Sequence, residues 1–106
     1  MRLVGAADSS KRLLAHAQRL ELPSALLEVP DALINEDAIA DLRRSDHASF
    51  WKHGIPAVFV SDTANFRTDT YHCTTRPDTV ETLDLGFATK VVRMSAGALA
   101  ELLAAP

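Results

Sequence analysis

The chain has 106 residues, of which 47% are apolar, and 11 basic against 14 acidic side chains leave a formal net charge of −3. This length predicts a single domain, residues 1–106, and excludes a multidomain protein. The acidic balance and the scattered basic residues exclude the electrostatic footprint of a nucleic-acid-binding protein.

Cys73 is the single cysteine, so neither an intrachain disulfide nor a four-thiolate zinc site can form. The N-terminal residues reach Asp8 before they accumulate the apolar run of a signal peptide, and no run approaches the length of a membrane span. As written, the sequence predicts a cytoplasmic protein with no membrane partner. A secreted or periplasmic location stays open if a leader precedes Met1.

The first half of the chain predicts two strands and two helices. A short apolar run predicts a strand over residues 3–6, and a helix follows from Asp8 with apolar residues at helical spacing until Pro23 ends it. Residues 25–29 predict a second strand. Residues 35–44 predict a short helix whose acidic start and basic end suit the helix dipole.

The second half predicts helices on either side of a strand and a long loop. Residues 46–53 predict a short helix that Gly54 closes in the left-handed conformation. Residues 57–60 are apolar without alternation, which is typical of a strand covered on both faces. Residues 61–82 show no period, and helical spacing returns over 83–103. Strands that alternate with helices predict an α/β fold, a partial and mainly parallel sheet with flanking helices.

The polar loop contains the side chains with the most chemical interest, Tyr71 and His72. α/β proteins place their sites in loops beyond the carboxyl ends of strands, and this loop follows the apolar strand directly. The other histidines are interpreted as structural: His16 as a surface or boundary residue, and His47 and His53 as residues on different faces of one helix that cannot chelate one ion.

A series of short motifs runs through the same region. They are Arg44-Ser45-Asp46-His47-Ala48-Ser49-Phe50, Gly54-Ile55-Pro56-Ala57, Tyr71-His72, Asp78-Thr79 and Leu83-Asp84. In this order and spacing, residues 44–93 resemble the C-terminal part of the co-catalytic di-zinc aminopeptidases, metallopeptidase family twenty-eight, which also contains the glutaminyl cyclases. Two departures are Cys73, where the family usually has Thr or Ser, and a slightly longer segment before Asp78.

The resemblance implies a role for three residues. His72 would be the last zinc ligand, and the hydroxyl of Tyr71 would steady the oxyanion of the tetrahedral intermediate. Asp46 would orient ligands without touching an ion. A tyrosine at position 71, where the cyclases have tryptophan, favours a peptidase. The fold implied is the C-terminal part of a larger zinc-exopeptidase-like sheet.

Most of a two-zinc site is missing from the sequence. The family supplies a His-x-Asp segment, an adjacent Glu-Glu pair with the general base and a further Asp, whereas the five glutamates here include no adjacent pair. We therefore expect a truncated zinc aminopeptidase, with at most a weak partial zinc site and no activity alone; peptides are the substrate of the complete enzyme. The alternatives are a non-enzymatic α/β interaction module and one half of a split peptidase. A sheet cut in this way exposes an edge, which predicts self-association or a complementary chain.

Overall fold

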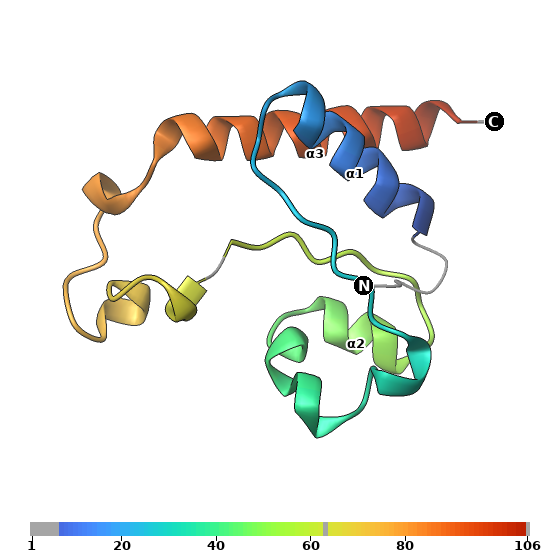
Figure 1. The fold of residues 1–106 in the computed structure, drawn as a ribbon, viewed down its shortest axis with the longest axis horizontal. Coiled ribbons are helices and arrows are strands. Elements are labelled where there is room, and N and C mark those ends of the chain that lie inside the picture. Colours follow the sequence, from blue (N-terminus) through green and yellow to red (C-terminus); the bar gives the residue numbers. More distant parts are fainter. Residues whose placement is uncertain (1–6, 63, 106) are drawn as a thin grey trace.

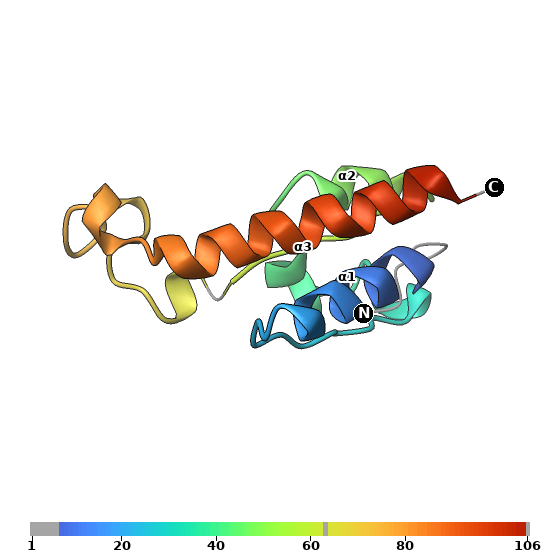
Figure 2. The ribbon, with the colours of Figure 1, turned by 90° about the horizontal axis from the view of Figure 1, so that it is seen from above.

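The computed structural model describes residues 7–62 and 64–105, and in these ranges the chain is helical (Figure 1). The α-helices are α1 (Ala7–Arg19), α2 (His47–Lys52) and α3 (Leu85–Ala104). Short 3-10 helices lie between them: η1 (Asp31–Leu33), η2 (Asp37–Arg43), η3 (Ala64–Phe66), η4 (Tyr71–Cys73) and η5 (Val80–Thr82). The molecule is flat, with extents of 44 × 35 × 18 Å, as the two perpendicular views show (Figure 2).

The predicted α/β fold with a parallel sheet is wrong, because no strand occurs within residues 7–62 and 64–105. Residues 25–29 and 57–60 form no backbone ladder, and the predicted strand over 3–6 lies outside the described residues. A strand requires a second backbone at hydrogen-bonding distance, which an apolar run does not guarantee. Here the carbonyl of Ala57 instead accepts a hydrogen bond from the indole of Trp51 at 3.0 Å.

The helix predicted between Asp8 and Pro23 is confirmed as α1, and it ends before the proline. Glu21 adopts a left-handed backbone with φ 51°, and the amides of Glu21 and Leu22 donate to the carbonyls of Gln18 and Ala17. This pair of hydrogen bonds is a Schellman motif, which stops the helix and turns Leu22 into the core.

The helix predicted over 83–103 is confirmed as α3, which crosses α1 (Figures 1 and 2). The side chain of Asp84 caps its start by accepting from the amide of Phe87 at 2.9 Å. A first core lies between α1 and α3, where Ala17, Leu22 and Met94 are buried.

A second core surrounds α2, and it is separate from the first. Val29, Ile34 and Trp51 are buried there, with the half-buried residues 57–59 packed against them. The helix predicted over 46–53 is confirmed as α2, and Gly54 follows with φ 69° as expected. The helix predicted over 35–44 forms as the kinked 3-10 segment η2. Val29 and residues 57–59 therefore contribute side chains to a core without a hydrogen-bonded ladder to a second backbone segment.

Candidate functional site

The polar loop after Phe66 is folded on itself and presents Tyr71 and His72. Arg76 makes two hydrogen bonds to Asp69, from Nε to Oδ2 at 2.8 Å and from Nη2 to Oδ1 at 2.6 Å. The amides of Thr75 and Arg76 also donate to the carbonyl of Asp69, at 3.2 and 3.4 Å. These contacts join the two ends of the segment, so residues 69–76 form a closed loop.

The Asp69–Arg76 pair is the main electrostatic feature of the loop. The side-chain hydrogen bonds from Arg76 lower the pKa of Asp69, and the bonds to Asp69 raise the pKa of Arg76. Both side chains are largely open to solvent. Water and salt therefore screen the charges, and the value of the pair lies in its two-bond geometry more than in its Coulomb energy.

His72 and Cys73 lie at the tip of this loop with left-handed backbones, at φ 53° and φ 56°. For residues with a Cβ this conformation is strained, and such strain is concentrated at functional sites. The imidazole of His72 is exposed and makes no hydrogen bond to the described residues. It stands edge-on to the ring of Tyr71, with centroids 4.3 Å apart. The rings of these two consecutive residues are thus in contact.

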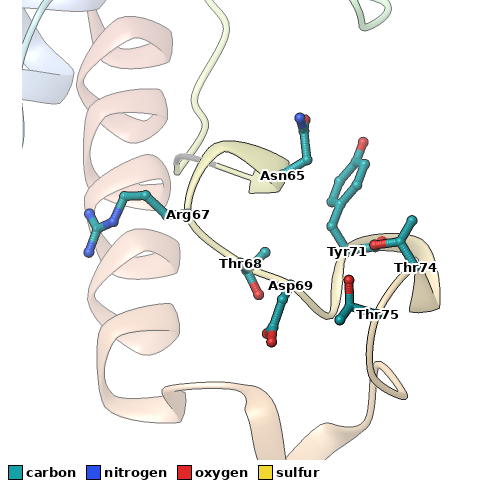
Figure 3. A pocket seen from close by; sticks show the side chains of 7 residues that line it. All are labelled: Asn65, Arg67, Thr68, Asp69, Tyr71, Thr74 and Thr75. Atoms are coloured by element: carbon teal, nitrogen blue, oxygen red, sulfur yellow. The ribbon is translucent and has the colours of Figure 1, made fainter.

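A shallow cavity of about 380 Å³ lies beside the loop, and Tyr71 lines it with Asn65, Thr68, Asp69 and other loop residues (Figure 3). The hydroxyl of the lining residue Thr68 lies 2.9 Å from the hydroxyl of Thr70, which is buried. Its lining residues are of polar types, and Tyr71 is the aromatic residue among them. His72 is not among its lining residues, so the imidazole faces solvent while the phenol faces the cavity.

A larger groove of about 1040 Å³ is mainly apolar. It lies between α1, α3 and the two extended segments, and its walls include Leu13, Leu26, Val60, Val91 and Val92. The catalytic and zinc-binding candidates Tyr71 and His72 do not line it. This groove is mainly an apolar surface, although Ser10, Ser24, Ser61, Asp62 and Arg67 also line it.

Asp46 is exposed and precedes α2 without capping it through its side chain. It does not line the cavity beside Tyr71. Arg44, at the end of η2, contacts a lining residue of this cavity by donating to the side-chain oxygen of Asn65 at 3.0 Å. The structure therefore brings Tyr71 and His72 together and leaves Asp46 on a separate element.

The remaining histidines contact other groups of the protein. His47 is buried, stacks on Phe59 at 4.2 Å and contacts the carbonyl of Leu42 through Nε2 at 2.6 Å. His53 Nδ1 contacts the carbonyl of Ser49 at 2.8 Å. His16 Nε2 lies 2.9 Å from a carboxylate oxygen of Glu101, between α1 and α3.

The described part of the chain contains no group of three or more His, Cys, Asp or Glu side chains that could hold a metal ion. His72 can supply one nitrogen ligand, and zinc sites use three or four protein ligands. The residues present therefore fit one ligand position and do not form a site by themselves. Among these same residues, no helix has the length and apolar character needed to cross a membrane.

Sequence reasoning missed the residues that shape the loop, Asp69, Thr70 and Arg76. The loop is closed by a contact between Asp69 and Arg76, which are seven residues apart and belong to no periodic pattern. Their opposite charges were therefore the signal in the sequence that could have predicted the contact.

Comparisons with known proteins give one short similarity. No protein-family model and no solved structure matches the chain. A segment of 28 residues, 26% of this chain, is 50% identical to the uncharacterized protein YfbL of Escherichia coli strain K12. The aligned segment spans 9% of the length of that relative.

Proposed function

We propose that this chain carries the last zinc ligand and the oxyanion-stabilising tyrosine of a co-catalytic zinc aminopeptidase, and that it acts together with a polypeptide that holds the remaining ligands. The observation that supports the proposal is the closed loop 69–76. It holds Tyr71 and an accessible, strained His72 side by side.

In such an enzyme, zinc supplies activated water for hydrolysis of the N-terminal peptide bond. The residues of this chain would hold the ion and orient the groups that react. His72 has its ring nitrogens free of hydrogen bonds to described residues, so an imidazole lone pair is available to an ion. The Tyr71 phenol would donate to developing negative charge. Because His72 faces solvent, the complementary polypeptide would have to cover the loop tip.

The experiment is complementation. The chain is mixed with a co-catalytic zinc aminopeptidase from which the segment equivalent to residues 44–93 has been removed, and hydrolysis of an amino-acid anilide is measured. We expect no turnover from the chain alone with zinc, and turnover from the mixture. His72→Ala should remove both the restored activity and one equivalent of zinc, whereas Tyr71→Phe should lower kcat and leave the zinc content unchanged.

His53→Ala is the matched control, because His53 is also exposed but holds a carbonyl of its own helix. This variant should complement as well as the parent chain. Turnover by the chain alone, or full complementation by His72→Ala, would contradict the proposal.

A non-enzymatic interaction module is the second candidate, and the exposed apolar side chains of α3 favour it. Leu85, Val92, Leu99 and Leu103 have 63%, 67%, 56% and 79% of their surface exposed. If the complementation fails while a stoichiometric protein partner binds the chain, this second candidate replaces the first.

A further inference from the structure

The side of α3 that faces away from α1 is apolar except at Thr89. At 100° per residue, Leu85, Val92, Ala96, Leu99 and Leu103 lie on one face of the helix, opposite the buried Met94. We call these five residues together with Thr89 the outer stripe. A helix of a monomeric protein usually carries polar residues on this side, so the outer stripe is an unpartnered surface.

The outer stripe has the spacing of a coiled-coil seam. Leu85, Val92 and Leu99 repeat every seven residues, and Thr89, Ala96 and Leu103 repeat every seven residues four positions later. These are the d and a positions of one heptad register, which is the pattern that packs a helix against another helix of the same kind.

The polar and charged groups of α3 do not oppose such packing. The Thr89 hydroxyl donates to the carbonyl of Leu85 at 2.7 Å, so it carries no unmet hydrogen bond into an interface. Glu101 and Lys90 are engaged on the α1 side, with Arg19 and with the carbonyl of Glu21. The third charged residue of α3, Arg93, lies beside the outer stripe and not within it, so docking through the stripe places no charged side chain inside the seam.

The chain exposes more surface than a compact protein of its mass, which is expected of a chain that binds a partner. The chain exposes 7629 Å², whereas a compact protein of 11.5 kDa exposes about 5800 Å². The excess, about 1800 Å², belongs to the chain as a whole, and it is of the size that obligate homodimers bury, roughly 1000–2500 Å² per chain. The groove beside α3 adjoins the stripe, because Val92 belongs to both.

We propose that the partner is a second copy of this chain and that the two α3 helices pair in parallel through the outer stripe. The orientation follows from Arg93, which lies at an e position beside the stripe. An antiparallel pair centred on the stripe would bring the two Arg93 side chains together. A parallel pair instead places each Arg93 near Ala88 of the other copy, at a g position.

Sedimentation equilibrium over a range of protein concentrations tests the pairing. The parent chain should show twice the monomer mass, and Val92→Glu should weaken the dimer by roughly a hundred-fold or more, because it buries two unpaired carboxylates. Leu99→Ser is a milder variant that should weaken it less. Leu33→Glu is the matched control: it adds the same charge at an exposed leucine on η1, outside α3, and should dimerise normally.

Disulfide formation in a Cys73→Ser background tests the orientation. Leu99→Cys should cross-link to itself in a parallel pair, and Lys90→Cys, on the α1 side, should not. A chain that is monomeric at every concentration, or a dimer unaffected by Val92→Glu, would overturn the proposal. So would a monomer that sediments with phosphatidylcholine vesicles, which would assign the stripe to a lipid surface. A dimer in which Leu99→Cys does not cross-link overturns the parallel arrangement.

Discussion

His72 combines an exposed imidazole, no hydrogen bond to described residues, and a left-handed backbone at φ 53°, which the next residue, Cys73, shares at φ 56°. Glu21 has a similar φ of 51°, but its conformation is explained by the Schellman motif that ends α1. No comparable helix end accounts for His72. The strain is consistent with a side chain held for a ligand.

Replacing His72 by glycine should therefore stabilise the loop while removing the proposed zinc ligand. Glycine relieves the left-handed conformation, which costs residues with a Cβ about 1 kcal/mol or more. We expect slower hydrogen exchange at the amide of Thr75, which closes the loop onto Asp69. Thr74→Gly, at φ −69°, is the control and should accelerate this exchange. Faster exchange in His72→Gly would show that the backbone at position 72 is not strained.

At the scale of elements, α1 and α3 approach closely at one glycine. A Cβ at Gly97 would lie 2.6 Å from Cε1 and Nδ1 of His16, well inside contact distance. Glycine therefore permits the crossing of the two helices, although it lowers the helix propensity of α3.

Gly97→Ala should destabilise the chain by about 1 kcal/mol, because overpacking costs 1–3 kcal/mol and the gain in helix propensity is about 1 kcal/mol. Chemical denaturation followed by circular dichroism measures the change. The double variant His16→Ala with Gly97→Ala should recover stability relative to the sum of the single changes. A Gly97→Ala chain more stable than the parent would show that His16 moves aside freely.

The same helix pair should lose stability in acid through Glu101. The hydrogen bond from Arg19 and the contact with His16 lower the pKa of Glu101 below its ordinary value of 4.5. A carboxyl group whose pKa is lowered by folding contributes stability above its unfolded pKa, and this contribution is lost as the pH falls through the folded pKa. Glu101→Gln should therefore be less stable than the parent at neutral pH, and the difference should shrink below pH 4.5. A difference that stays constant with pH would contradict the role of the carboxylate.

At the scale of the whole molecule, the two cores are separate, which predicts unfolding in more than one step. Trp51 is the single tryptophan and belongs to the core around α2, whereas most of the helix lies in α1 and α3. The fluorescence and circular dichroism transitions should therefore have different midpoints in urea. Val92→Glu should shift the circular dichroism transition and leave the fluorescence transition in place. Coincident transitions for both probes would show that the two cores unfold as one unit.

The sequence by itself determined the three α-helices, the left-handed Gly54 and the position of the loop that carries Tyr71 and His72. Helical periodicity, capping and glycine conformation are local properties, so residues close in the sequence are enough to predict them. The roles of Tyr71, His72 and Asp46 rest on the family resemblance and remain predictions.

Only the tertiary structure decided whether residues 25–29 and 57–60 pair as strands, because pairing depends on a second backbone that the run itself does not specify. It also decided the closing of the loop by Asp69 and Arg76, the burial of His47 against Phe59, and the exposure of the outer stripe. Each of these depends on contacts between residues that no periodic pattern relates, or on which face of a helix is covered. The apolar pattern predicts that a face will be covered, but it does not say whether the same chain covers it.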